Sequence, residues 1–229
     1  MKPKIEITKD GSSTLVHHKY NAHYHSTFGA IEESDFVYIN TGLLYFLSTE
    51  SGQNLKQSCS VLELGFGTGL NAFNTLLKTE DLPLNIHYLG IETDPVPMDI
   101  VSQLNYPEQL LASHKTEVFK TMHQTIWEQP NQITKQFVLE KRKQDIMDLK
   151  VKNEYNVIYF DAFGPAEQPE LWTESVFKIM FEALQSNGVL MTYCAQGAAR
   201  RAMQSAGFTV TRLPGPPSKR HILRAIKSC

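Results

Sequence analysis

A short apolar stretch, a glycine-rich turn and a helix-forming stretch follow one another between residues 60 and 80. The expected strand ends at Leu64, and Gly65, Gly67 and Gly69 fill the turn in VLELGFGTGL. Because glycine has no Cβ, such a turn can adopt positive φ angles and bring its backbone close to a ligand. The helix N-terminus after it offers free N–H groups and the positive end of the helix dipole. This order predicts a ligand-binding loop at the edge of a parallel sheet.

The chain after this loop keeps alternating between strand-like and helix-like segments. The expected strands are IHYLGIE, QFVLEKRKQ, NVIYFDAF, VLMTYCA, FTVTRL and HILRAI, and apolar residues recur at helical spacing in PELWTESVFKIMFEALQ. The alternation predicts an α/β fold with right-handed crossovers and a mostly parallel, seven-stranded sheet covered on both faces. The link PGPPSKR is too short for a crossover helix, so the last strand is expected to be antiparallel.

The first 58 residues follow a different pattern. KIEITKDGSSTLVHH alternates polar and apolar residues around Asp10-Gly11, which predicts a β-hairpin, and VYINTGLLYFL predicts a helix leading into the core. We therefore expect an N-terminal β-hairpin and helical extension over residues 1–58 and a sheet domain over residues 59–229. The two parts are expected to form one structural unit.

Composition narrows the class of protein. The 229 residues are 41% hydrophobic, and 22 Lys and Arg against 24 Asp and Glu give a formal charge of −2. This balance argues against non-specific coating of nucleic acid, but it is compatible with an enzyme that holds RNA through local basic patches. Three scattered cysteines without a CxxC pair are typical of reduced thiols. With no membrane-length apolar stretch and no signal-peptide core, we expect a soluble, cytoplasmic protein.

The spacing of the glycines discriminates between nucleotide ligands. G-F-G-T-G is neither the dinucleotide fingerprint nor a P-loop. Glu92 ends the second strand, where an acid can accept hydrogen bonds from both ribose hydroxyls, and Asp145 follows the third strand, on the adenine side. The pattern predicts S-adenosylmethionine, an adenosine cofactor without a pyrophosphate; the alternative for both acids is a solvated strand end. The expected cofactor contacts are Glu63, Gly65, Phe66, Gly67, Thr68, Gly69, Glu92, Asp145 and Asp161.

A carboxylate also ends the fourth strand. Asp161 follows the apolar run YNVIYF, and Pro165 and Pro169 restrict the loop after it. Ligands in open α/β sheets bind outside the carboxyl ends of the strands, so Asp161 is expected beside the cofactor. A carboxylate there can orient an amine and accept its proton during methyl transfer. Asp161 is our candidate catalytic residue; the alternative is a cap of the next helix or turn.

These motifs resemble the methyltransferase domain of bacterial tRNA 5-methylaminomethyl-2-thiouridine biosynthesis proteins. The similarity is carried by FGTGLN, DAFGPAEQPELW, GFTVTRLPG and SKRHILRA, with DGSSTL and SDFVYINTGL nearer the N-terminus, and it covers nearly the whole chain. It implies a Rossmann-like class I methyltransferase that methylates the 5-aminomethyl group of a wobble uridine in tRNA. It also implies the type without a fused flavin domain, for which a separate flavin-dependent oxidase is a candidate partner.

The resemblance carries over to particular residues. It implies that the three glycines, Glu92 and Asp145 contact the cofactor. It also implies that Asp161 receives the substrate amine. The family often has Asn where this chain has Gln168. The residues assigned to substrate contact are Tyr24, Phe163 and Pro165, with Lys219 and Arg220 for phosphates.

Alternatives remain for the histidines and for the function. His23 and His25 lie on one face of an expected strand near His17 and His18, but no Cys or acid nearby completes a metal site, so we predict none. These rings fit a substrate entrance or an ordinary surface equally well.

The rival functions are methyl or aminopropyl transfer to a free small amine, and a non-catalytic RNA-binding module. A polyamine enzyme would need several acids in its pocket, whereas the loop after Asp161 offers Glu167 and Glu170.

Overall fold

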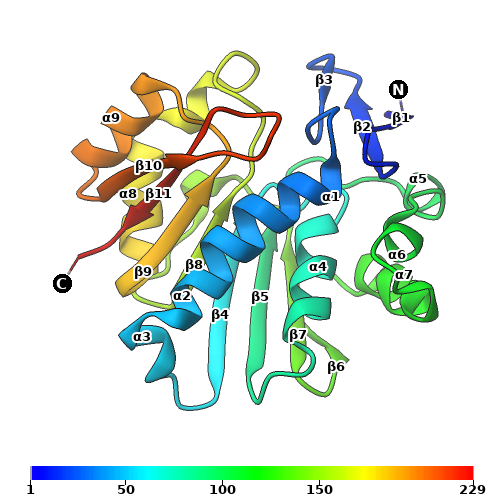
Figure 1. Cartoon of the computed structure of the whole chain (residues 1–229), viewed down its shortest axis with the longest axis horizontal. Coiled ribbons are helices and arrows are strands. Elements are labelled where there is room, and N and C mark those ends of the chain that lie inside the picture. Colours follow the sequence, from blue (N-terminus) through cyan, green and yellow to red (C-terminus); the bar gives the residue numbers. More distant parts are fainter. Residues whose placement is uncertain (1, 229) are drawn as a thin grey trace.

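The computed structural model describes residues 2–228 (Figure 1). Within these residues, eight strands form one central sheet in the order β10-β11-β9-β8-β4-β5-β7-β6. The strands are β4 (Ser58–Leu64), β5 (Asn85–Ile91), β6 (Pro130–Thr134), β7 (Phe137–Arg142), β8 (Tyr155–Phe160), β9 (Leu184–Thr192), β10 (Thr209–Pro214) and β11 (His221–Ile226). The seven expected strands are thus confirmed, and β6 is an addition.

The order and direction of the strands indicate where a ligand can bind. β7, β5, β4, β8 and β9 run parallel, and β11 is antiparallel to both β9 and β10, as the short link before it predicts. From β4 the chain builds the sheet first through β5 and β7 and then on the other side through β8 and β9. The order therefore reverses between β4 and β8, which is where open α/β sheets form a ligand crevice.

Helices cover both faces of the sheet (Figure 1). Val61 of β4 packs in one core with η1 and α4, whereas the next residue, Leu62, packs in a second core with α8 and α9. This alternation follows from the two-residue period of a strand. The helices are α1 (Ala30–Glu33), η1 (Ser34–Leu44), α2 (Tyr45–Ser48), α3 (Glu50–Gln53), α4 (Leu70–Thr79), α5 (Met98–Val101), α6 (Tyr106–Gln109), η2 (Ser113–Lys115), α7 (Thr116–Gln124), η3 (Ile146–Asp148), η4 (Pro169–Trp172), α8 (Glu174–Ala183) and α9 (Gly197–Ser205).

The N-terminal segment adds a small second sheet. β1 (Lys4–Ile7) pairs antiparallel with β2 (Ser13–His17), which confirms the predicted hairpin, and β3 (Ala22–His23) pairs with β2. The helix expected in VYINTGLLYFL is η1, a π-helix that continues from α1 into α2. Leu15 and Val37 share the core of β4 and α4, so this segment packs on the main sheet. The boundary at residue 58 stays a prediction.

No helix within residues 2–228 has the length and hydropathy needed to cross a membrane.

Candidate functional site

The glycine turn lies where β4 meets α4, against the end of β8. The φ angles of Gly65, Gly67 and Gly69 are +93°, +47° and +71°, a region that side chains disfavour. A Cβ at Gly65 would lie 2.6 Å from the carbonyl oxygen of Asp161. The backbone N–H of Asp161 in turn donates to the carbonyl of Leu64 over 3.0 Å. The turn and the acid, 96 residues apart at Gly65 and Asp161, are therefore in direct backbone contact.

A cavity of about 820 Å³ opens at this place. Most of the predicted site residues line it: Tyr24, Glu63, Gly65, Phe66, Gly67, Thr68, Glu92, Asp145, Asp161 and Phe163. Gly69 is the N-cap residue of α4 and adjoins the lining, whereas Pro165, Lys219 and Arg220 lie outside it. Seven acids line the cavity: the six already named from the sequence, Glu63, Glu92, Asp145, Asp161, Glu167 and Glu170, and in addition Asp94. Such a lining favours a positively charged ligand.

Glu92 connects the end of β5 to the glycine turn. One carboxylate oxygen accepts the N–H of Gly67 at 2.9 Å, and the other accepts the N–H groups of Thr93 and Asp94 at 2.8 and 2.9 Å. Burial raises the pKa of Glu92, and these three backbone donors oppose the rise. Asp145 is exposed and accepts from the N–H of Met147 at 2.9 Å, so it caps η3 from within the cavity wall.

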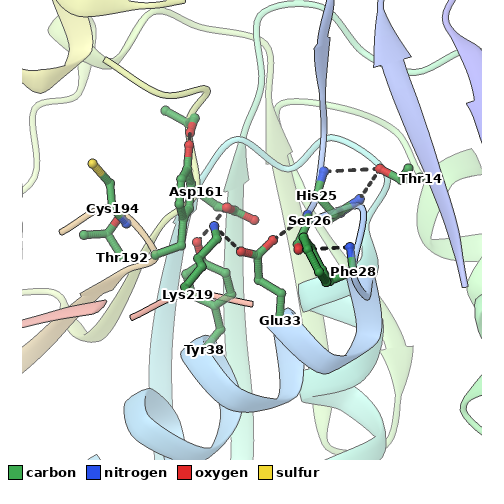
Figure 2. Close-up of polar contacts among 12 residues, drawn as sticks. Thr14, His25, Ser26, Phe28, Glu33, Tyr38, Asp161, Thr192, Cys194 and Lys219 are labelled. Carbon is green, nitrogen blue, oxygen red and sulfur yellow. Dashed lines mark hydrogen bonds and ion pairs between the residues drawn. The ribbon is translucent and has the colours of Figure 1, made fainter. Parts of the chain in front are cut away.

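Asp161 is held by two hydrogen bonds from different elements, and Figure 2 shows the one from Tyr38. The hydroxyl of Tyr38 in η1 donates to Oδ1 at 2.6 Å, and Nδ2 of Asn71 in α4 donates to Oδ2 at 2.8 Å. Burial, followed by the nearby negative charge of Glu33, raises the pKa of Asp161 to about 7 despite these bonds. The carboxyl group can therefore gain and lose a proton in the neutral range while its orientation stays fixed.

Glu63 lies beneath this acid and is buried. Its Oε1 accepts from Asn71 Nδ2 at 2.8 Å, and its Oε2 accepts from the hydroxyl of Tyr88 at 2.8 Å. Burial and the neighbouring Asp161 raise the pKa of Glu63 well above its usual range. Because Asn71 donates to both acids, it sets the distance between them.

The N-terminal segment covers the cavity. A Cβ at Gly67 would lie 3.1 Å from the ring of Tyr24, so this ring rests on the turn. Tyr24 and Phe163 are in edge contact, with ring centroids 5.1 Å apart, and Tyr20 lies 5.3 Å from Phe163. Gln168, at the position of the family's Asn, accepts from the N–H of Phe163 and donates to the hydroxyl of Tyr20. Aromatic rings and this amide thus connect the segment to the loop after β8.

Two half-buried histidines contact Thr68 in the turn, His25 from the cavity lining and His123 from α7. Nε2 of His25 lies 3.3 Å from the hydroxyl of Thr68, and Nε2 of His123 donates to the carbonyl of Thr68 at 3.0 Å. Burial lowers the pKa of His25 to about 4 and that of His123 to about 3, so both rings are neutral. They act as uncharged supports for the loop.

His23 and His25 do not form a metal-binding pair, because His23 contacts Glu6, with Nε2 2.9 Å from the carboxylate. The expectation that no acid lies near the histidines is wrong, since the potential ligand atoms of His17, His18 and Asp94 lie within 4.8 Å of one another. Nδ1 of His17 accepts from the N–H of Lys19 at 3.1 Å, so in the neutral ring the proton sits on Nε2, 3.4 Å from Asp94. Metal binding at Nε2 would require the proton to move to Nδ1, which would break the hydrogen bond from Lys19, so these contacts favour a structural role.

The two predicted phosphate contacts differ in their surroundings. The Lys219 ammonium forms an ion pair with buried Glu33 and lies 3.8 Å from the ring centroid of Tyr193. It therefore points inward, and the expectation that Lys219 contacts phosphate does not fit these partners. Arg220 is exposed and remains a prediction. Pro165 is half-buried in its loop.

Sequence reasoning missed the two residues that orient Asp161. Asn71 stands directly after the glycine turn in FGTGLN, so a polar residue in the first turn of that helix was a usable signal. Tyr38 lies in a separate element, 123 residues from Asp161, and no local spacing indicates the contact.

Comparisons with known proteins bear on this geometry. A family model described as S-adenosyl-L-methionine-dependent methyltransferase matches residues 105–228. The chain is 27% identical over 212 residues to the tRNA 5-methylaminomethyl-2-thiouridine biosynthesis bifunctional protein MnmC of Ralstonia nicotianae, covering 88% of this chain and 31% of the relative. The MnmC protein of Methylobacillus flagellatus is 27% identical over 218 residues, covering 89% of this chain and 33% of that relative. The chain thus spans about a third of the length of these curated relatives.

Solved structures share the fold. The crystal structure of MNMC2 from Aquifex aeolicus superposes with a TM-score of 0.74 at 23% identity, covering 97% of this chain and 70% of that one. Spermidine synthase from Thermotoga maritima gives a TM-score of 0.53 at 14% identity, covering 99% and 73%. At these identities the similarity establishes the architecture alone.

Proposed function

The chain belongs to the S-adenosyl-L-methionine-dependent methyltransferase family, and on that premise we propose that it methylates an amine on tRNA. The acceptor is the 5-aminomethyl group of the wobble uridine or 2-thiouridine. The observation that carries this proposal is the placement of Asp161, which shares one cavity with the glycine turn and is oriented by Tyr38 and Asn71. The two MnmC relatives support the choice of tRNA.

The cavity suits this cofactor. The turn has no room for a Cβ at Gly65, and Glu92 and Asp145 line the cavity at the ends of neighbouring parallel strands. We assign Glu92 to the ribose and Asp145 to the adenine. Among the described lining residues Lys19 is the one lysine or arginine, which argues against a pyrophosphate and for a cationic ligand. When bound, S-adenosylmethionine supplies a methyl group on positively charged sulfur.

Asp161 performs the proton chemistry. A carboxylate oxygen of Asp161 accepts a hydrogen bond from the amine and directs the nitrogen lone pair toward the methyl carbon. The new N–C bond forms as the S–C bond breaks, and the proton released by the amine passes to Asp161. Tyr38 and Asn71 keep the carboxylate in place throughout. Tyr24 and Phe163, at the mouth of the cavity, are suited to contact the uracil ring, and Arg220 to contact phosphate.

The first test is nucleoside analysis of tRNA by mass spectrometry in cells with and without the gene. We expect the 5-methylaminomethyl nucleoside to disappear and its aminomethyl precursor to accumulate. Purified protein and S-adenosylmethionine should then convert the precursor in that tRNA. An unchanged nucleoside profile would contradict the tRNA proposal and leave the family membership intact. The cytoplasm as its location, and a separate flavin-dependent oxidase as the source of the amine, belong to the same proposal.

A free small amine is the second candidate. It is favoured by the seven acids that line the cavity, since an enzyme acting on polyamines needs several acids in its pocket. Incubation of the protein with polyamines and either S-adenosylmethionine or its decarboxylated form decides between the candidates. Product from polyamines, with none from precursor-bearing tRNA, would favour the small amine.

Cofactor affinity is expected to depend on pH. Burial, as the largest cause, raises the pKa of Asp161 to about 7, so the acid is charged above pH 7 and neutral below. A sulfonium cation prefers the charged form, and the Kd for S-adenosylmethionine should rise up to about tenfold between pH 8 and pH 6. S-adenosylhomocysteine has neutral sulfur but the same ribose and amino acid, so calorimetry with it is the control. An equal pH dependence for both ligands would place the sulfur away from Asp161.

A further inference from the structure

The loop between β10 and β11 reaches the candidate catalytic acid from the edge of the sheet. β10 is the outermost strand on its side, yet residues 215–220 cross toward the N-terminal end of α1 (Figure 1). The loop is tightly closed, since the N–H of Lys219 donates to the carbonyl of Pro216 at 2.8 Å and that of Gly215 to the carbonyl of Arg220 at 3.2 Å. A Cβ at Gly215 would overlap the carbonyl oxygen of Lys219. The backbone of Lys219 therefore has a defined position.

The Lys219 side chain is fixed between a buried acid and an aromatic ring. Its ammonium pairs with Oε1 of Glu33, whose side chain is 7% exposed and whose Oε2 accepts from the N–H of Ser26 at 2.8 Å. It also lies over the ring of Tyr193, and the hydroxyl of Tyr193 donates to the carbonyl of Ala162, the residue after Asp161, at 2.9 Å. Figure 2 shows Lys219 and Glu33 both directed toward Asp161.

We propose that Lys219 and Glu33 form a positioning pair that sets the charge state of Asp161 and couples it to the β10–β11 loop. The coupling to methyl transfer rests on the proposed function, whereas the effect on the acid is a property of the free protein. The pair contributes opposite charges at one wall of the site. Removing the charge of Lys219 and removing that of Glu33 are expected to shift the pKa of Asp161 in opposite directions.

The other ionisable groups that face Asp161 differ from Lys219 and Glu33 in that burial disfavours their charged forms. Tyr38 from η1, Tyr88 from β5 and Tyr193 after β9 all have pKa values raised well above the usual range by burial, and so does Glu63 from β4. The three tyrosines are neutral near pH 7, and burial disfavours the charged form of Glu63. Of the charged groups, Glu33 raises the pKa of Asp161 and Lys219 lowers it.

The test titrates Asp161 directly in the substrate-free protein. Carboxyl carbons of ¹³C-labelled aspartate are followed by NMR from pH 4 to pH 9, and Asp161→Asn identifies the resonance. Lys219→Met should raise the midpoint of Asp161, and Glu33→Gln should lower it by a larger amount, each on the order of one pH unit. The double variant removes both charges, and its midpoint should lie between those of the two single variants.

Arg220→Met is the matched control, because it removes a neighbouring positive charge that is exposed on the same loop. It should leave the midpoint unchanged. Lys219→Arg keeps the charge and should also leave it near the wild-type value. Since Lys219→Met leaves Glu33 buried without its partner, the opposite shift in Glu33→Gln provides the test if the first variant does not fold. Shifts in the same direction, or no shift in Glu33→Gln, would overturn the proposal.

This experiment separates the two hypotheses. A wild-type protein inactive on tRNA would contradict the proposed function and leave the titration result standing. If tRNA is methylated, the acidic limb of the kcat/KM profile should move with the NMR midpoint across the same variants. If the enzyme is active but the Asp161 midpoint stays unchanged in both Lys219→Met and Glu33→Gln, the positioning-pair proposal is wrong and the proposed function stands.

Discussion

Replacing Asp161 with asparagine is expected to lower kcat/KM for methyl transfer by about 100- to 10,000-fold, the usual range for loss of a general base. The amide can still form hydrogen bonds with Tyr38 and Asn71, but it cannot take the proton from the amine. Stability should be retained, because the substitution removes a carboxylate whose burial disfavours its charged form. Single-turnover assays with precursor-bearing tRNA and a thermal melt measure both effects.

Asp145→Asn is the control for this prediction. Asp145 lines the same cavity, but it is exposed and caps η3 at a distance from the proposed amine. Its replacement should weaken cofactor binding without changing the single-turnover rate at saturating cofactor. An Asp161→Asn protein with activity within tenfold of wild type would mean that water or tRNA accepts the proton.

The fold could be predicted largely from local patterns. Apolar strand segments and amphipathic helices recur in order, and the short PGPPSKR link requires the antiparallel pairing that β11 shows. The edge strand β6 escaped prediction because PNQIT is half-buried or exposed throughout and has no apolar alternation. An edge strand is defined by its partner, here β7, and sequence patterns do not encode the partner.

The site residues that stand at the ends of parallel strands could be predicted from the sequence. Glu92 and Asp161 end parallel strands, so the topology brings them to one edge of the sheet, and both line the cavity. Tyr38 and Lys219 come to the acid from η1 and from the β10–β11 loop, which reach it only through tertiary packing. Lys219 also shows why a basic run is ambiguous: only the position of Glu33 decides that this lysine points inward while Arg220 does not.

Gly65→Ala is expected to disrupt cofactor binding by separating the glycine turn from Asp161. The backbone has φ +93° at this position, and the new Cβ would lie 2.6 Å from the Asp161 carbonyl oxygen, which is backbone and cannot rotate away. Strain of this kind costs about 1–3 kcal/mol. We expect the free energy of unfolding in urea to fall by that amount, and the Kd for S-adenosylmethionine in calorimetry to rise at least about tenfold, equivalent to 1.4 kcal/mol.

Gly197→Ala provides the matched comparison, because it makes the same chemical change where the backbone allows it. Gly197 is exposed at the start of α9, and an added Cβ would meet only the guanidinium of Arg201, at 3.2 Å. Alanine is the better helix former, so stability should stay constant or rise slightly, with the cofactor Kd unchanged. If Gly65→Ala bound the cofactor as tightly as Gly197→Ala, contact between the turn and Asp161 would not be required for binding. The cofactor would then have to be held by the acids at the ends of β5 and β7 instead.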